Sequence, residues 1–349
     1  FFYPGVDASF VFTNAIPALK DVSFIDYGKI RGGYTKVSAI NVGTTTTTFG
    51  STTGLYINNG AYSLASTYLP GTGFPFGSQA SFSANGTIVQ PNLVPEATYS
   101  TEAGIELSFF KRRVAGAFTY YNQRSKGQTL NSPITQTSGY TTLTQNAGEV
   151  KNQGVEADLN ITPVRLENGL TVTIGGNFNY NNNEVISLPD GTPQLALSTG
   201  GNAQLYAIPG QPYPILQGSH YQRTDDGRVK LTRTTDPSGN VYYVPLKASD
   251  NMNFGNTQPK YKYGFNAAIS YKGLTLSGQG ELRTSYVIYN TIGENLDFTG
   301  SGARSVTYDR QNFVFPNSAY STDGGATYQP NTSLPTPGGS EFWASAAYN

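Results

Sequence analysis

Residues 99–126 read YSTEAGIELSFFKRRVAGAFTYYNQRSK, two stretches joined by a turn at Lys111-Arg112. Successive side chains of a β-strand point to opposite faces, so alternation with a period of two sorts the residues by face. In 99–109 the odd positions carry Tyr99, Thr101, Ala103, Ile105, Leu107 and Phe109, and the even positions carry Ser100, Glu102, Gly104, Glu106 and Ser108. The stretch therefore predicts a hairpin strand with one apolar face and one polar face.

The same alternation recurs along the chain, for example in 172–180 and 263–271. We expect eight strands, near 6–14, 24–37, 99–109, 113–126, 144–162, 169–187, 259–272 and 274–290, with a ninth beginning around 341. Several of these exceed the five or six residues typical of strands in globular proteins. A tilted strand that crosses a bilayer takes about 9–11 residues, and longer strands rise above it.

Short and long connections alternate between these strands. Tight turns at Lys111-Arg112, Glu167-Asn168-Gly169 and Lys272-Gly273 contrast with long polar stretches rich in Gly and Pro, at about 39–97, 127–142, 188–258 and 291–340. Outer-membrane barrels have short periplasmic turns and longer extracellular loops. The sequence therefore predicts an all-β fold, an antiparallel transmembrane β-barrel, with residues 1–349 forming one barrel segment and the long loops outside the cell.

The composition agrees with a barrel but does not by itself exclude an extracellular β-sandwich. The 22 basic and 22 acidic residues balance, so no field for nucleic acid is expected. Only 13% of residues are charged, whereas Tyr (25), Phe (19) and Gly (40) are abundant. Cysteine is absent, which excludes disulfides and thiolate chemistry. No apolar run approaches the roughly 20 residues of a membrane-spanning helix.

One part of the chain resembles a known family. The motifs are Asn92-Leu93-Val94-Pro95-Glu96, Phe118-Thr119-Tyr120-Tyr121-Asn122, the run from Asn146 to Glu156 (NAGEVKNQGVE), Ile161-Thr162-Pro163-Val164, Asn177 to Val185 (NFNYNNNEV) and Pro259 to Phe265 (PKYKYGF). Their order and spacing resemble the barrel of SusC/RagA-type TonB-dependent transporters of the Bacteroidetes outer membrane. The match is strongest over about 92–188 and weaker in the long loops.

The resemblance implies a barrel of about 22 strands closed by an N-terminal plug, energised through TonB and covered by a SusD-like surface lipoprotein. The eight or nine strands expected here are under half of such a barrel, and no plug or TonB box is recognised. We therefore expect an internal part of the barrel of a larger importer of oligosaccharides or peptides.

No enzyme, cofactor or metal site is expected from the residues. The single histidine, His220, lies in a long loop with no partner that the sequence places, and it is interpreted as a surface residue. Asp225-Asp226-Gly227 and Asp236-Pro237-Ser238-Gly239 are interpreted as turns, because the closing Glu of a calcium-binding EF-hand loop is missing. The Gly-rich motifs within 146–154 are interpreted as strand bulges or close backbone approaches.

Two groups of residues are candidates for contact with a solute. Glu102, Glu106, Glu281 and Arg283 lie on polar strand faces; they either contact a plug or line the path of a solute or are solvated lumen residues, and no specific recognition role is assigned to them. Aromatic residues of the third long loop are the candidate ligand-binding residues: Tyr206, Tyr213, Tyr221, Tyr242 and Tyr243. Tyrosine offers contact area and a hydroxyl at small entropic cost. The same rings also suit the packing of a folded loop or of the lid lipoprotein.

Three hypotheses follow. The first is a TonB-linked importer in the outer membrane. The second is a self-contained small barrel that acts as a passive pore or adhesin, which requires closure between its first and last strands. The third is a secreted soluble β protein, which needs a second sheet to cover the apolar face of 99–109 and 263–271.

Overall fold

The computed structural model describes residues 2–20, 22–39, 48–49, 52–53, 68–70, 79–84, 86–146, 148–189, 191–197, 203–339 and 342–343. The chain divides into two compact units. The first comprises Phe1–Leu195, Ile208–Tyr213 and Pro259–Ser285, and the second comprises Ala196–Ala207, Pro214–Gln258 and Tyr286–Asn349. The assignment of 1–349 to one barrel segment stays a prediction.

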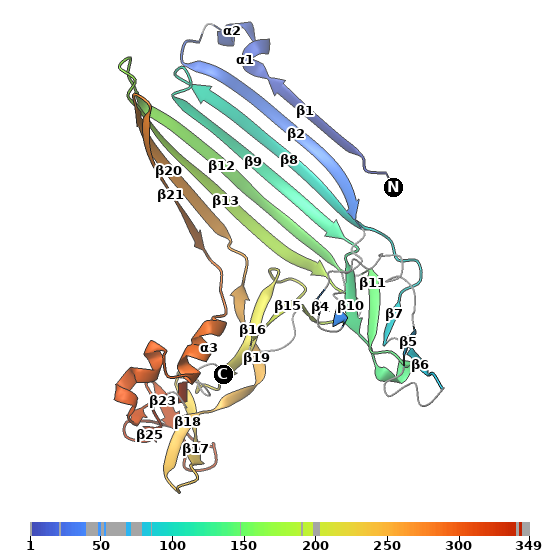
Figure 1. The fold of residues 1–349 in the computed structure, drawn as a ribbon, viewed down its shortest axis with the longest axis vertical. Helices are drawn as coiled ribbons and strands as arrows, with labels where there is room; N and C mark the ends of the chain where they lie inside the picture. Colours follow the sequence, from blue (N-terminus) through green and yellow to red (C-terminus); the bar gives the residue numbers. More distant parts are fainter. Residues whose placement is uncertain are drawn as a thin grey trace. The chain divides into compact units, whose positions relative to one another are not determined.

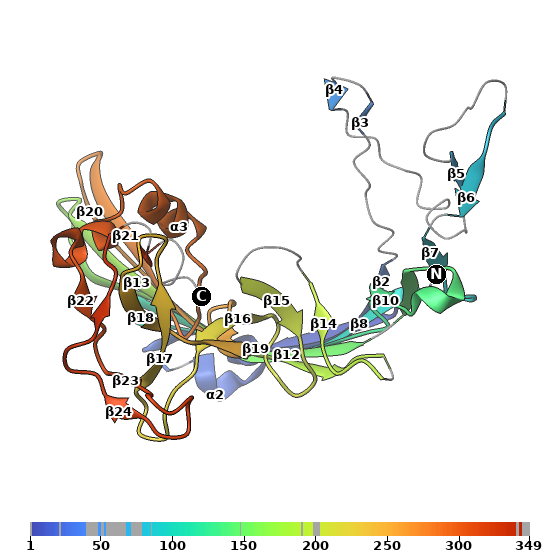
Figure 2. The same cartoon turned by 90° about the horizontal axis from the view of Figure 1, so that it is seen from below.

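One antiparallel sheet of eight strands dominates the first unit (Figure 1). In spatial order it contains β1 (Gly5–Val11), β2 (Ile25–Ala39), β8 (Glu96–Phe109), β9 (Val114–Lys126), β12 (Glu149–Arg165), β13 (Thr171–Ser187), β20 (Tyr261–Tyr271) and β21 (Leu274–Thr284). The strands form a single curved layer (Figure 2). Among the described residues β1 and β21 each pair on one side only, so the closure that a self-contained small barrel requires is not seen there.

The eight expected strands are confirmed, with ends that differ from the expected ones by up to six residues. The first ends at Val11, the last at Thr284, and 144–162 is divided between β11 (Thr142–Asn146) and β12. Of the ninth strand expected near 341, the structure describes only residues 342–343, and these are helical.

The early end of β1 has a local cause in the connection to β2. Here α1 (Phe12–Ala15) and α2 (Pro17–Lys20) replace the expected strand end. The Phe12 ring covers Gly28, where an added Cβ would lie 2.2 Å from the ring. The Thr13 hydroxyl accepts a hydrogen bond from the Gly28 amide at 3.1 Å, which fixes the bend. Packing of the Phe12 ring over Gly28 thus accompanies the early end of the strand.

The other short connections at this end are tight turns. In the β20–β21 hairpin both Lys272 (φ 46°) and Gly273 (φ 89°) are left-handed, as in the turns that suit the twist of two-residue hairpins. Phe110, Lys111 and Arg112 are all left-handed in the β8–β9 turn. Among the described residues, no helix combines the length and the apolar character needed to cross a membrane.

The first two long loops contain secondary structure of their own. Their elements are β3 (Thr48–Phe49), β4 (Thr52–Thr53), β5 (Tyr68–Pro70), β6 (Phe82–Ala84), β7 (Thr87–Val89), β10 (Thr129–Pro133) and η2 (Gln136–Ser138), together with β11. Strand β11 pairs antiparallel with β10 and parallel with β7. Segments from 39–97 and 127–142 are therefore joined in one small sheet.

The second unit consists of most of the third and fourth long loops, and the described residues of both contain regular secondary structure. Its elements are β15 (Ala203–Ala207), β16 (Ile215–Tyr221), β17 (Val229–Thr235), β18 (Val241–Pro245), β19 (Lys247–Asn256), α3 (Thr291–Phe298), η3 (Ala303–Arg310), β22 (Phe313–Val314), β23 (Ser318–Tyr320), β24 (Gln329–Pro330) and β25 (Pro335–Thr336); β14 (Leu195–Ala196) lies at the boundary. Ile215, Val229, Leu231 and Phe313 are buried in this unit and form part of its core.

The register of the large sheet aligns side chains of one kind across the strands. One row across β2, β8, β9, β12, β13, β20 and β21 reads Ile30, Ile105, Phe118, Ala157, Phe178, Tyr263 and Leu282. We call the side that carries this row the apolar face. Phe118 is 46% exposed and Leu276 is 74% exposed on it. Side chains at the intervening positions form the polar face.

Candidate functional site

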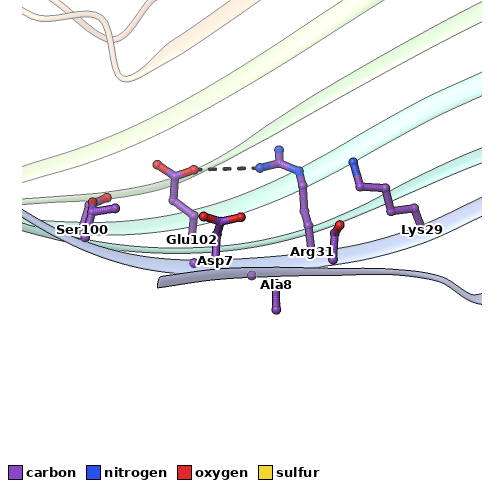
Figure 3. Close-up of a pocket in the computed structure, with 10 residues that line it drawn as sticks. Asp7, Ala8, Lys29, Arg31, Ser100 and Glu102 are labelled. Carbon is purple, nitrogen blue, oxygen red and sulfur yellow. Dashed lines mark ion pairs between the residues drawn. The ribbon is translucent and has the colours of Figure 1, made fainter. Parts of the chain in front are cut away.

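Charged side chains of β1, β2 and β8 gather on the polar face. Figure 3 shows Asp7, Lys29, Arg31 and Glu102 on one side of the sheet, whereas Ala8 points to the other side. The alternation of the strands causes this separation, because Asp7 and Ala8 are neighbours on β1. These groups line an open pocket of about 330 Å³.

Arg31 is the centre of a hydrogen-bonded ion network. Its Nε lies 3.4 Å from Glu106 Oε1, and its Nη1 lies 3.9 Å from Glu102 Oε2. Its Nη2 donates to Thr119 Oγ1 at 2.7 Å, and Lys29 Nζ donates to Glu106 Oε1 at 3.1 Å. The network therefore ties β2, β8 and β9 together across the polar face.

Gly104 provides the space for the Arg31 guanidinium. A Cβ added at this position would lie 3.2 Å from both Arg31 Nε and Thr119 Oγ1, and 3.0 Å from the Phe118 carbonyl oxygen. These are tighter than ordinary van der Waals contacts. Glycine thus allows the Arg31 guanidinium to lie flat on the strand. Any other residue at this position would require Arg31, Thr119 or the Phe118 backbone to move.

A row of asparagines covers the polar face of β13. Asn177, Asn179, Asn181 and Asn183 alternate with outward-facing side chains on this strand. The Tyr121 hydroxyl donates to Asn181 Oδ1 at 2.9 Å, and Asn179 Nδ2 donates to Glu156 Oε1 at 3.0 Å. An amide both donates and accepts hydrogen bonds, so this row offers both functions to a neutral polar solute.

The close backbone approach expected at Gly154 is confirmed. A Cβ there would lie 2.0 Å from the Tyr180 carbonyl oxygen and 2.6 Å from the Tyr121 hydroxyl. The Tyr121 ring therefore occupies the place of the missing side chain. The register of β12 against β13 also shifts between Glu149 and Val150, but the extra residue is Ile186 of β13 and not a glycine of the motif.

The polar-face carboxylates that the sequence indicated are found where expected. Glu102 and Glu106 join the Arg31 network, and Glu281 pairs with Arg283 on β21. Sequence reasoning missed Lys29 and Arg31. Their spacing of two within 24–37 was a usable signal, because it places both cations on one strand face.

The five candidate tyrosines do not form one aromatic cluster. All five are described, and no ring contact joins any two of them. Tyr213 belongs to the first unit, where its backbone amide donates to Asn183 Oδ1 at 3.2 Å and its carbonyl accepts from Asn183 Nδ2. The other four lie in the second unit.

Two of those four, Tyr206 and Tyr243, have side-chain contacts, and the hydroxyl of a third, Tyr221, is buried. The Tyr206 hydroxyl donates to Gln204 Oε1 at 2.9 Å. The Tyr243 ring meets Tyr320 edge-on at 6.0 Å, and its carbonyl oxygen accepts from Thr336 Oγ1 at 2.7 Å. The Tyr221 hydroxyl is buried without a hydrogen-bond partner among the described residues, and burial raises its pKa to about 12. Tyr213, Tyr221 and Tyr242 have neither a ring contact nor a side-chain hydrogen bond within the described part of the chain, and of these three burial raises the pKa of Tyr213 and Tyr221.

The turn interpretation of the aspartate motifs is confirmed. Asp236 accepts from the Asn240 side-chain amide at Oδ2 (2.9 Å) and from the backbone amides of Asn240 (2.8 Å) and Ser238 (2.9 Å) at Oδ1, and these bonds hold the pKa of its carboxyl below the usual range. Asp226 likewise accepts from Thr224 and Arg228. His220 Nε2 lies 3.4 Å from Asp250 Oδ1. Across the described residues there is no group of three or more His, Cys, Asp or Glu placed to hold a metal.

Fold and faces together define a class of protein. Long antiparallel strands with an exposed apolar face, an opposite polar face, short connections at one end and long folded loops at the other are the wall of an outer-membrane β-barrel.

Within this class, the family model described as "TonB dependent receptor-like, beta-barrel" matches residues 8–340, and the chain belongs to this family. It is therefore an outer-membrane protein of a receptor family rather than an enzyme.

The chain is similar to named members of the family. It is 24% identical over 318 residues to the TonB-dependent receptor SusC of Bacteroides thetaiotaomicron, covering 87% of this chain and 28% of that protein. It is also 24% identical over 268 residues to TonB-dependent receptor P3 of Formosa agariphila, covering 70% of this chain and 25% of the receptor. The resemblance to SusC/RagA-type barrels is thus confirmed, and the chain spans about a quarter of these relatives.

A solved structure shares the fold. The structure of the RagAB peptide transporter superposes with a TM-score of 0.63 at 18% identity, covering 84% of this chain and 30% of that one. The same transporter in an open-open state gives a TM-score of 0.62.

Proposed function

We propose that the chain forms part of the barrel wall and the outer loops of a SusC-like importer of oligosaccharides or peptides. The importer works together with a SusD-like surface lipoprotein and takes its energy from TonB through a plug. Similarity to SusC and to the RagAB peptide transporter supports the proposal. Transport by such a protein is binding and gated passage, in which no bond is made or broken.

The polar face carries the proposal. Its side chains include the ions paired around Arg31 and the amides of β13; Glu102 is balanced by Arg31 and Glu281 by Arg283. A wall of this kind hydrates the lumen without holding a strong field of one sign. Such a wall suits neutral polar cargo, which exchanges hydrogen bonds with amides at little net cost.

Contact with cargo is proposed for the tyrosines of the third long loop, Tyr206, Tyr213, Tyr221, Tyr242 and Tyr243. Tyr242 is the first choice, because it is half-exposed on β18 and has no ring contact or side-chain hydrogen bond among the described residues, whereas Tyr213 and Tyr221, which share that property, have pKa values raised by burial. A ring of this kind stacks on the face of a sugar or grips an apolar peptide side chain.

Uptake by cells tests the proposal. Cells with and without the full-length receptor are given labelled oligosaccharides and labelled peptides, with a protonophore in parallel samples. We expect one cargo class to enter only in cells that have both receptor and proton gradient. Receptor-dependent entry that persists without the gradient would favour the passive pore instead, and equal entry in both strains would exclude import of these cargoes.

Two further measurements separate the parts of the proposal. Tagged receptor purified in mild detergent is expected to bring down a surface lipoprotein. Tyr242→Ala is expected to raise the half-saturating cargo concentration several-fold, whereas Tyr242→Phe, which keeps the ring, leaves it near wild type. Equal behaviour of both variants would remove Tyr242 from the cargo site.

A further inference from the structure

Basic side chains form a line at the loop end of the apolar face. The register places Lys36 of β2 opposite Tyr99, Tyr99 opposite Arg124, and Arg124 opposite Lys151 of β12. Lys126 stands in the next row, opposite Glu149. We call Lys36, Arg124, Lys126 and Lys151 the basic rim.

Strand periodicity places the basic rim on the outside of the wall. Lys36 is six residues from Ile30, Arg124 is six from Phe118, and Lys151 is six from Ala157. An even separation keeps side chains on one strand face, so the rim shares the apolar face and not the polar face. A solute inside the barrel therefore does not meet these cations.

The height of the basic rim matches the surface of a membrane. At about 3.3 Å per residue, six residues separate it from the Phe118 row by roughly 20 Å along the strand. A strand tilt of about 40° reduces this to about 15 Å along the membrane normal, slightly more than half of an apolar band about 25 Å tall. Phe118 is also six residues from Arg112 in the opposite turn, so its row lies midway along β9.

The charges of the basic rim are only partly balanced. Glu149, whose side chain is 17% exposed, lies 3.2 Å from Arg124 Nη1 and 3.4 Å from Lys126 Nζ, so one carboxylate serves two cations. Glu184 stands opposite Lys151 in the register. Lys36 Nζ lies 5.5 Å above the Tyr99 ring and has no ion pair among the described residues. Four cations thus face two carboxylates.

Tyrosines lie directly below the basic rim on the same face. Tyr34 precedes Lys36 by two residues, and Tyr120 precedes Arg124 by four. Tyrosine rings favour the headgroup level of a bilayer, and lysine and arginine reach from there into the polar layer while their aliphatic stems stay on apolar surface.

We propose that the basic rim binds the phosphate groups of anionic lipid in the outer leaflet, whose acyl chains cover the apolar face below. A lipid fits this surface better than a protein partner, because the cations continue directly into an exposed apolar band of bilayer height. Anionic phosphate would neutralise the positive charge of the basic rim that Glu149 and Glu184 do not. The site depends on membrane residence alone and does not rest on the cargo of the importer.

Lipid binding to the full-length receptor tests this site. Detergent-purified receptor is titrated with lipid A that carries two phosphates, and bound lipid is counted by native mass spectrometry. The test variant is Lys36→Gln with Lys151→Gln, because neither lysine has an ion pair to lose among the described residues. The matched control is Lys111→Gln with Lys272→Gln, which removes the same charge at the short turns.

We expect the test variant to bind about thirty-fold more weakly and the control to bind like wild type, since each lysine near an anionic lipid surface contributes roughly a factor of five. Lys36→Arg with Lys151→Arg keeps the charge and is expected to retain binding, which separates loss of charge from misfolding. Equal binding by the test variant would overturn the proposal.

The lipid itself provides the second arm of the test. Lipid A stripped of phosphate is expected to bind as weakly to wild type as the intact lipid binds to the test variant. If the stripped lipid binds equally well, acyl packing rather than phosphate holds it, and the proposal fails. If millimolar inorganic phosphate displaces the lipid completely, the rim is a free-phosphate site and the assignment to lipid is wrong.

Discussion

At the scale of single residues, Asn146 of β11 binds to both of the first two long loops. Its Nδ2 donates to the carbonyls of Val94 (2.7 Å) and Gly127 (2.8 Å), and its Oδ1 accepts from the Val94 amide at 2.6 Å. Sequence reasoning singled out the motif around Asn146 for its Gly content. It did not show these bonds, because their partners lie 52 and 19 residues away.

Replacing this amide with a carboxylate tests the connection. Asn146→Asp keeps the acceptor but loses both donor bonds and turns an anion toward two carbonyl oxygens. We expect a loss of about 1–3 kcal/mol in local stability, seen as faster amide exchange in 127–146. Asn168→Asp is the matched control, because Asn168 Oδ1 only accepts, from the Leu170 amide. Unchanged exchange in Asn146→Asp would show that the donor bonds contribute nothing.

Tyr221 makes the second unit sensitive to alkaline pH. Burial raises the pKa of its hydroxyl from 10.0 to about 12, because the phenolate is poorly solvated there. Because the folded state favours the neutral hydroxyl, the stability of the folded unit is unaffected by this group below pH 10 and falls as pH rises toward 12. We expect protease cleavage within 203–258 to increase over this interval.

Tyr221→Phe is expected to remove much of this alkaline sensitivity without loss of stability at neutral pH, since the hydroxyl has no partner among the described residues. Tyr242→Phe, which removes a hydroxyl from the same unit, is expected to keep the sensitivity. The same cleavage profile in wild type and Tyr221→Phe would contradict the assignment.

At the scale of elements, the β1–β2 corner depends on one glycine. Gly28→Ala forces the Phe12 ring away from its place, because the new Cβ would lie 2.2 Å from it. We expect a loss of about 1–3 kcal/mol in the stability of the purified receptor, the range of overpacked cores. Gly32→Ala, on the same strand and face, meets only the Glu102 carbonyl at 3.5 Å and is expected to be neutral or slightly stabilising. Equal thermal midpoints for the two variants would show that the Phe12 ring does not pack against Gly28.

Strands and tight turns could be predicted because each depends on local pattern. The alternation in 99–109 and the Lys272-Gly273 turn need no distant partner. The ends of β1 and β21 and the folded nature of 188–258 could not be predicted. Phe12 depends on Gly28, and β17 of the third long loop pairs with β23 of the fourth, about ninety residues further along the chain. Only part of the ion network could be predicted. The alternation placed Glu102 and Glu106 on a polar strand face, but their partner Arg31 is 71 residues or more away in the sequence.

At the scale of the whole molecule, the two faces of the wall lie in different solvents. Leu276→Cys and Ser277→Cys, neighbours on β21, report on opposite faces, and the chain contains no other cysteine. In outer membranes we expect a charged maleimide to label Ser277→Cys at least tenfold faster than Leu276→Cys, because lipid covers the apolar face. A lipid-soluble maleimide is expected to reverse the order. Equal rates with the charged reagent would mean that water reaches both faces.

The parallel pairing of β7 with β11 has a consequence for how such receptors diversify. The two loops share a sheet and the hydrogen bonds of Asn146, so a changed sequence in either loop must still pair with the backbone of the other. We therefore expect the two loops to be inherited together. If residues 79–97 alone are grafted into a relative, β7 must pair with a foreign β11. A graft of 79–146 transfers both strands together and keeps their pairing. Recombination between relatives should therefore preserve this block and place its crossover points in the strands on either side.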